Sequence, residues 1–179
     1  MHIICATKTE ALPIIDALHL HQIAHKPFTI YQNPHHTLII SGIGTIQAAA
    51  ATSYILALTE DAILNIGYAA GKEVGKLFHI HKVIDSCSNK VFHLPKSTTL
   101  PNMACTTYPL PQTKPTKTLA DMEAASIVQA AKIFKAPITI LKVVSDRFDP
   151  NSFIKNSSLI EKNLDVILSQ IGLQSAQNF

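Results

Sequence analysis

Short, nearly continuous apolar runs recur along the chain and are separated by polar or alanine-rich stretches. Runs of this kind predict strands that are buried on both faces of a sheet. They cover residues 2–6, 28–32, 37–41, 62–67, 77–85 and 136–146. The pattern therefore predicts a sheet whose strands come from most of the length of the chain.

Apolar residues at helical spacing lie between and after these runs. They predict helices over residues 9–20, 45–58, 119–134 and 151–172. Thr9 is the expected N-cap of the first helix, and Gly172 is the expected C-cap of the last. Alternating strands and helices predict an α/β sandwich with a largely parallel or mixed sheet. A chain of 179 residues suits one domain, spanning residues 1–179.

The segment from 86 to 117 departs from this pattern. It contains five prolines and many serines and threonines, and it shows little periodicity. We expect a long irregular connection there, with one or two short strands. A connection of this length inside a compact domain is often functional.

The composition points to a partner for the apolar surface. Hydrophobic residues make up 47% of the chain and charged residues only 15%. A small domain with so few charges must cover part of its apolar surface, so we expect an oligomer. The net charge of +3 is modest and the basic residues are scattered. This distribution argues against a nucleic acid partner.

The cysteines and the chain start indicate a reduced, cytoplasmic protein. Cys5, Cys87 and Cys105 are odd in number, and none forms a CxxC pair. The first residues lack the pattern of a signal peptide, and no apolar run is long enough to span a bilayer.

The histidines of HIH (79–81) and PHH (34–36) lack a nearby cysteine or carboxylate at ligand spacing. We therefore expect no metal site.

Polar residues follow several of the predicted strands directly. In α/β sheets, binding sites collect beyond the carboxyl ends of strands. This rule selects Glu10, the SGIG turn at 41–44, the turn at 67–71 and the pair Ser145–Asp146. The glycine turns are weak signals, since neither forms a dinucleotide-binding or P-loop motif. No serine or cysteine lies in the setting of a known catalytic nucleophile.

Two carboxylates begin the predicted helix of DMEAASIVQAAKIF. Capping and the helix dipole account for Asp121, and they also offer an explanation for Glu10. Glu123 is explained less well, because its neighbours are methionine and alanine, and a buried carboxylate is costly unless it has a partner. We therefore expect functional roles for Glu123 and Asp146.

Four motifs, in this order and spacing, resemble the nucleoside phosphorylase/nucleosidase superfamily. They are SGIGTIQAAAATSYIL, ILNIGYAAG, DMEAASIVQAAKIF and ILKVVSD. The match is to the branch of methylthioadenosine/S-adenosylhomocysteine nucleosidases and the futalosine hydrolases of menaquinone synthesis. The resemblance covers nearly the whole chain. It implies a three-layer α/β/α sandwich with a central mixed, largely parallel sheet, a homodimer, and an enzyme that needs no cofactor.

The resemblance also implies roles for individual residues in cleavage of an N-glycosidic bond. Glu10 matches a carboxylate that helps to activate the attacking water, and Glu123 matches one that grips the ribose and assists the same water. Met122 would pack under the ribose, while Asp146, preceded by Ser145, would protonate or hydrogen-bond purine N7. These roles suit an oxocarbenium-like transition state, which nearby carboxylates favour, and a purine that leaves more readily once N7 is protonated.

Several positions depart from the family pattern. Tyr68 replaces a small serine in the turn that it shares with Ala69, where phosphorylases help to hold phosphate. The bulk of this tyrosine favours water as the nucleophile. Asp121 replaces a longer acid, so its contact with substrate is an open question. The connection at 85–118 is shorter than usual; Tyr108 is the candidate there for stacking on the base, with an ordinary turn residue as the alternative.

The predicted function is therefore a purine nucleoside hydrolase. The opening ATKTEALPII is more similar to the futalosine-hydrolysing branch than to methylthioadenosine nucleosidases, which favours futalosine or 6-amino-6-deoxyfutalosine as the substrate. Three alternatives stay open. They are a methylthioadenosine/S-adenosylhomocysteine nucleosidase, a phosphate-dependent nucleoside phosphorylase, and an inactive protein that binds nucleosides.

Overall fold

The computed structural model describes residues 1–149, 151–152 and 158–177. The strands are β1 (His2–Cys5), β2 (His21–Ala24), β3 (Thr29–Gln32), β4 (Thr37–Ile40), β5 (Ile63–Ala70), β6 (Leu77–Asp85), β7 (Val91–His93), β8 (Asn102–Thr107), β9 (Leu119–Asp121) and β10 (Ile138–Asp146). The helices are α1 (Lys8–Ala17), α2 (Thr45–Leu58), α3 (Ala124–Ile133), α4 (Leu159–Lys162) and α5 (Leu164–Gln177).

All of these strands belong to one mixed sheet. Strands β4, β1, β5 and β10 are paired in that order, and each pair is parallel. Beyond β10 the sheet continues through β6, β8 and β9, and β9 pairs with β5 again. The sheet therefore closes on itself on that side, while β3 and β2 extend its open edge.

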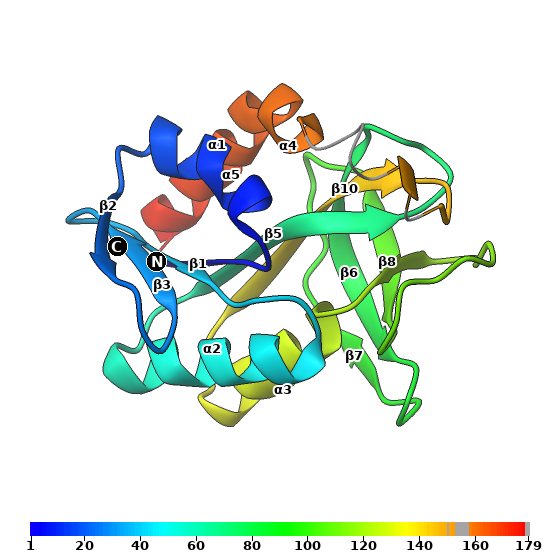
Figure 1. Cartoon of the computed structure of the whole chain (residues 1–179), viewed down its shortest axis with the longest axis horizontal. Helices are drawn as coiled ribbons and strands as arrows, with labels where there is room; N and C mark the ends of the chain where they lie inside the picture. Colours follow the sequence, from blue (N-terminus) through cyan, green and yellow to red (C-terminus); the bar gives the residue numbers. More distant parts are fainter. Residues whose placement is uncertain (150, 153–157, 178–179) are drawn as a thin grey trace.

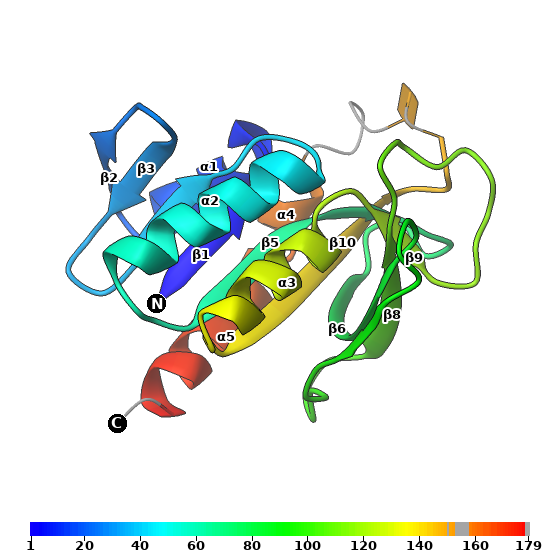
Figure 2. The same cartoon turned by 90° about the horizontal axis from the view of Figure 1, so that it is seen from below.

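Helices cover both faces of the parallel strands (Figure 1). Helices α1, α4 and α5 lie on one face, and α2 and α3 lie side by side on the other (Figure 2). The hydrophobic core on the first face includes Ile14, Leu64 and Ile167. The core between the sheet and the helices α2 and α3 includes Ile55 and Ile127. The predicted α/β class, with a central mixed sheet between helices, is therefore confirmed.

The predicted helix at 119–134 is wrong at its start. Residues 119–121 form the strand β9, because Leu119 pairs with Cys105 of β8 and Ala120 pairs with Ala70 of β5. The helix begins only at Ala124. The carboxylates of DME therefore lie in the strand and turn before α3, where their side chains are free to face a site.

Two predicted helix caps also differ from the structure. The N-cap of α1 is Thr7 and not Thr9, because the Thr7 side chain accepts a hydrogen bond from the Glu10 N–H and Glu10 bonds back to the Thr7 backbone. Gly172 lies inside α5 and does not end it. The predicted helix at 151–172 corresponds to α4 and α5, and its residues 153–157 lie outside the described part.

The long connection at 86–117 contains β7 and β8, in agreement with the prediction of one or two short strands. Strand β2 was not predicted, because HQIA carries two polar residues and is exposed along most of its length. The parallel arrangement of β1, β5 and β10 brings the carboxyl ends of all three strands to the same edge of the sheet.

Candidate active site

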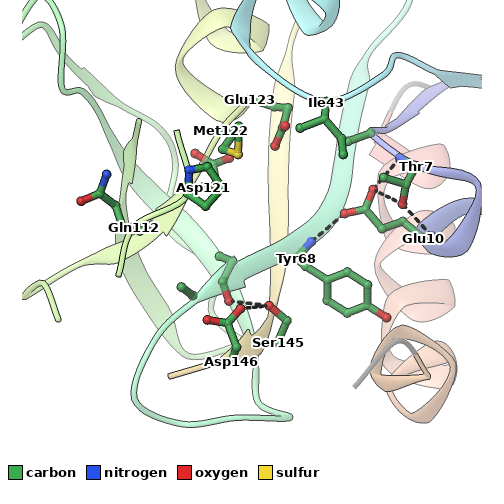
Figure 3. Close-up of a pocket in the computed structure, with 15 residues that line it drawn as sticks. Thr7, Glu10, Ile43, Tyr68, Gln112, Asp121, Met122, Glu123, Ser145 and Asp146 are labelled. Carbon is green, nitrogen blue, oxygen red and sulfur yellow. Dashed lines mark hydrogen bonds between the residues drawn. The ribbon is translucent and has the colours of Figure 1, made fainter. Parts of the chain in front are cut away.

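A pocket of about 260 Å³ opens at this edge of the sheet (Figure 3). It is lined by Ala6, Thr7, Glu10, Ile43, Tyr68, Ala69, Ala70, Pro111, Gln112, Ala120, Asp121, Met122, Glu123, Ser145 and Asp146. The structure thus gathers the acids selected from the sequence, which are up to 136 positions apart in the chain, around one cavity.

Glu10 is buried in the first turn of α1, and three donors hold its carboxylate. The backbone N–H of Thr7 donates to Oε2 at 2.8 Å, and the Thr7 hydroxyl donates to the same oxygen at 3.1 Å. The N–H of Tyr68, at the end of β5, donates to Oε1 at 3.0 Å. The carboxylate therefore spans from α1 to β5, and its position is set from both elements.

Glu123 is buried at the N-cap position of α3 and faces the start of α2. Its Oε1 accepts the Gly44 N–H at 2.8 Å, so the carboxylate lies at the N-terminus of α2, where the helix dipole favours negative charge. Gly44 has φ of +100°, a conformation that glycine adopts readily. Burial raises the pKa of Glu123 to about 7; Lys142 opposes this rise and Asp121 adds to it.

Asp121 is engaged by the protein on both of its oxygens. The Thr107 hydroxyl donates to Oδ1 at 2.7 Å, and the Ala124 N–H donates to Oδ2 at 2.8 Å. Lys142 Nζ forms an ion pair with the same Oδ2 at 2.9 Å. Asp121 therefore caps the start of α3 and neutralises a buried lysine.

Lys142 lies at the centre of this arrangement and was not predicted. It belongs to β10, and only 1% of its side chain is exposed. Burial alone would lower the pKa of Lys142, but attraction to Asp121 and Glu123 overcomes that effect and raises it. The sequence did contain a signal for this residue, a lysine inside the apolar run ITILKVV. A buried charge without a partner is very costly, so a lysine in a buried strand indicates an acid beside it.

Asp146 lies on the opposite side of the pocket from Glu123, at the end of β10 (Figure 3). The Ser145 hydroxyl donates to its Oδ2 at 2.6 Å, and the Asp149 N–H donates to Oδ1 at 3.0 Å. A β-bulge between Val144 and Asp146 interrupts the pairing with β5 at this point. The bulge re-aims the side chains at the strand end.

Of the remaining predicted residues, all but Tyr108 line the pocket. Met122 and Ala69 line the pocket. The Tyr68 ring also lines it, and its hydroxyl accepts the Ile160 N–H of α4 at 3.2 Å. Tyr108 does not line the pocket, so its stacking role stays a prediction. Pro111 and Gln112, three and four residues further on, line it instead.

Sequence reasoning also missed Thr7 and Ile43. Thr7 lies next to the end of β1, and the spacing T-x-x-E is a capping-box signature that would have found it. Ile43 lies in the SGIG turn, and no pattern in the sequence singled out its side chain. The turn itself was selected only as a strand end.

The described residues contain no group of three or more histidine, cysteine or carboxylate side chains placed to hold a metal ion. None of the helices in the described part combines the length and apolarity needed to cross a bilayer.

No protein-family model matches the chain, and no curated protein matches it in sequence. Solved structures do match it. The 5′-methylthioadenosine nucleosidase of Arabidopsis thaliana has a TM-score of 0.83 at 18% identity, over 95% of this chain and 94% of that one. A futalosine hydrolase mutant of Helicobacter pylori has a TM-score of 0.79 at 15% identity, over 94% and 98%.

A third structure is the 5′-methylthioadenosine/S-adenosylhomocysteine nucleosidase of Streptococcus pneumoniae with a transition-state inhibitor. It has a TM-score of 0.78 at 17% identity, over 91% of this chain and 95% of that one. The resemblance seen in the sequence motifs is thus confirmed at the level of the fold. The chain has the fold of the methylthioadenosine/S-adenosylhomocysteine nucleosidases and of the futalosine hydrolase.

Proposed function

We propose that the protein is a purine nucleoside hydrolase that cleaves an N-glycosidic bond with water. The observation that carries this proposal is the convergence of Glu10, Glu123 and Asp146 on one pocket, with Lys142 buried beneath it. Carboxylates on two sides of a pocket suit a reaction that develops positive charge on a sugar and negative charge on a departing base. The structural neighbours are nucleosidases, which supports the same reaction class.

In the proposed reaction, Glu10 activates the attacking water. Its Oε1 lies near Gly67 of β5, where an added β-carbon would meet Oε1 at 3.0 Å and Lys142 Nζ at 3.3 Å. The Glu10 carboxylate and the Lys142 ammonium group therefore both lie close to Gly67. A water bound to this carboxylate from the pocket would lose a proton to it while the water oxygen attacks C1′ of the ribose.

Glu123 and Met122 form the ribose part of the proposed site. One oxygen of Glu123 is held by Gly44, which leaves the other oxygen for a ribose hydroxyl. An ionised Glu123 also favours the positive charge that grows on the sugar ring. Met122 offers an apolar surface under the ring.

Asp146 acts on the base. It protonates N7, or hydrogen-bonds to it once protonated, so that the bond between C1′ and N9 breaks with its electron pair going to the purine. The products are a free base and a sugar that carries the hydroxyl of the attacking water. Ser145 and Asp149 hold the Asp146 carboxylate in place.

Water is favoured over phosphate by two features of the site. The Tyr68 ring occupies the wall beside Glu10, in the turn where a small residue would leave room for an anion. The start of α2, which would suit an anion, already holds the Glu123 carboxylate through Gly44. Both features leave little attraction for a second negative group.

A base-release assay tests the proposal. Purified protein is incubated with futalosine, aminodeoxyfutalosine, methylthioadenosine, S-adenosylhomocysteine, inosine and adenosine, with and without phosphate. We expect release of a free base without phosphate from at least one of them, and a loss of at least about a hundredfold in Glu123→Gln. Strict dependence on phosphate would establish a phosphorylase, and full activity of Glu123→Gln would refute the assignment.

For the substrate, we propose futalosine or 6-amino-6-deoxyfutalosine, in menaquinone synthesis. The start of α1, TKTEALPII, and the short connection before β9 support this choice, and the fold likeness to the futalosine hydrolase is consistent with it. The alternative substrates are methylthioadenosine and S-adenosylhomocysteine. The same assay decides between them through the ratio of kcat/KM values.

We also propose that the protein works as a homodimer in the cytoplasm. Helix α2 exposes large apolar side chains, since Ile46 and Leu58 are 84% and 62% exposed on it. Ile43, 60% exposed, joins this surface to the pocket. A second copy is the partner that would cover such a surface.

Sedimentation tests the proposed dimer. We expect the wild type to sediment as a dimer and Ile46→Glu to sediment as a monomer, because the charge could not be buried in the interface. Ile23→Glu is the matched control, since Ile23 is 59% exposed on the strand β2 and is not part of α2. A monomeric wild type, or an Ile46→Glu variant that stays dimeric, would contradict the proposal.

A further inference from the structure

The acid of the capping box of α1, Glu10, has a second set of contacts outside the helix. In a capping box, the acid at the third helical position returns to the N-cap backbone and serves the helix alone. Here that acid is Glu10, which also lines the pocket and accepts a bond from Tyr68 of β5. The same carboxylate therefore belongs both to the helix cap and to the site.

The two oxygens of Glu10 have different surroundings. Oε2 receives both donors of Thr7, the N–H at 2.8 Å and the hydroxyl at 3.1 Å. Oε1 receives the Tyr68 N–H and lies over Gly67, on the side of Lys142. The Thr7 hydroxyl additionally accepts the N–H of Glu10 at 3.3 Å, so it holds the backbone and the carboxylate of the same residue.

We infer that Thr7 is a positioning residue, whose hydroxyl aims Oε1 of Glu10 at the attacking water. This inference rests on the proposed hydrolase function, in which Glu10 activates that water. Fixing Oε2 from the helix side determines the rotation of the carboxylate, and with it the direction of the Oε1 lone pair that is not used by Tyr68. If the Glu10 carboxylate were rotated away from this direction, it would lose much of its effect as a general base, since small misplacements cost up to about a hundredfold in rate.

A purely structural role for Thr7 makes a different prediction. If the hydroxyl only caps α1, then any good N-cap residue restores activity along with stability. Aspartate separates the two roles, because it accepts the Glu10 N–H as a cap does but has no proton to donate to Oε2. Serine keeps both the cap and the donor.

The experiment compares Thr7→Val, Thr7→Asp and Thr7→Ser with the wild type, in base release from the best nucleoside of the panel. We expect Thr7→Val and Thr7→Asp to lose about tenfold to a hundredfold in kcat, with KM changed by less than about threefold. Thr7→Ser should recover most of the lost kcat. Thr52→Val is the control, since it removes a buried hydroxyl that donates to Ala48 within α2.

Melting temperatures recorded in parallel show that each assay is run on folded protein. Thr7→Asp at wild-type kcat would overturn the inference and leave Thr7 as a cap only. A Thr7→Val variant as active as the wild type, or Thr7→Ser as poor as Thr7→Val, would overturn it too. These results differ from a failure of the proposed function, in which the wild type itself releases no base from any nucleoside.

Discussion

Two parts of the pocket lining, the strand side and the loop side, are built differently. The strand side comprises the acids that gather around the strand ends, and each of these carboxylates has fixed partners; they are Glu10, Asp121, Glu123 and Asp146. Lys142 forms the buried ion pair with Asp121. The other side includes the loop of residues 109–118, represented by Pro111 and Gln112. Within the described residues, the side-chain hydrogen bonds of 109–117 stay close in sequence, such as Gln112 to the Leu110 carbonyl at 3.3 Å. Only at the end of the loop does a side chain reach the sheet, where the hydroxyls of Thr118 and Thr106 lie 2.8 Å apart.

This difference separates the chemistry from the choice of substrate. Groups that must act on a transition state need fixed positions, which strand ends and buried ion pairs provide. A loop held by local contacts changes shape at little cost to the fold. We therefore expect substitutions on the strand side to affect stability and rate strongly, and substitutions on the loop side to affect the choice of nucleoside.

The largest effect is expected for Lys142→Met. It leaves Asp121 as a buried acid without its cation, which costs about 3–5 kcal/mol of unfolding free energy. Urea unfolding measures this loss. The double variant Asp121→Asn/Lys142→Met removes both charges and should recover most of it.

The exposed pair Lys76–Glu73, at 2.7 Å, is the matched control for this prediction. Its side chains are 44% and 53% exposed, so Lys76→Met should cost less than about 1 kcal/mol. Equal losses in Lys142→Met and Lys76→Met would show that burial of the pair has no energetic consequence.

A slightly smaller effect is expected for the pH dependence of stability. The folded-state pKa of Glu123 is about 7, above the ordinary value of 4.5. Between these values the folded protein holds a proton that the unfolded chain has lost, so the stability falls as pH rises through this window, by roughly 3 kcal/mol. Glu123→Gln removes this loss.

The measurement is the difference in unfolding free energy between Glu123→Gln and the wild type at pH 5 and pH 8. It should shift in favour of the variant at the higher pH, and the contributions of groups that both proteins share cancel in the difference. A difference that stays constant from pH 5 to pH 8 would contradict the raised pKa.

Gly67→Ala should reduce the rate by about a hundredfold while the fold is kept. The new β-carbon would lie 3.0 Å from Glu10 Oε1 and 3.3 Å from Lys142 Nζ, so it would push the Glu10 carboxylate away from its position. Steady-state kinetics and circular dichroism measure the two outcomes. Gly172→Ala in α5 is the control, because among the described residues the added carbon meets no atom within 4 Å beyond its chain neighbours and its own helix backbone.

Much of this strand side could be predicted from the sequence, because its residues follow apolar runs. Glu10, Glu123 and Asp146 were selected in this way, and all three line the pocket. The capping role expected for Asp121 agrees with the bond that it accepts from the Ala124 N–H. Its contacts with Thr107 and Lys142 could not be predicted, because only the fold brings these residues together. Thr107 and Lys142 are 14 and 21 positions away in the chain.

The loop side was predicted poorly for a physical reason. The segment at 86–117 has no periodicity, so nothing in the sequence indicates which of its side chains face the pocket. Tyr108 was selected for its aromatic ring alone. In the structure, its backbone N–H donates to the Asp121 carbonyl at 2.8 Å, and the chain enters the pocket only at Pro111.

The smallest effect is therefore expected for Gln112→Ala. Gln112 lines the pocket, but its amide donates only to Leu110 of its own loop among the described residues. We expect kcat/KM to change by less than about tenfold for any nucleoside, and the change to differ between nucleosides with different bases. The measurement is kcat/KM for futalosine, methylthioadenosine and inosine in the wild type and the variant. A uniform loss of a hundredfold or more would place Gln112 with the fixed groups of the strand side and remove the distinction between the two sides.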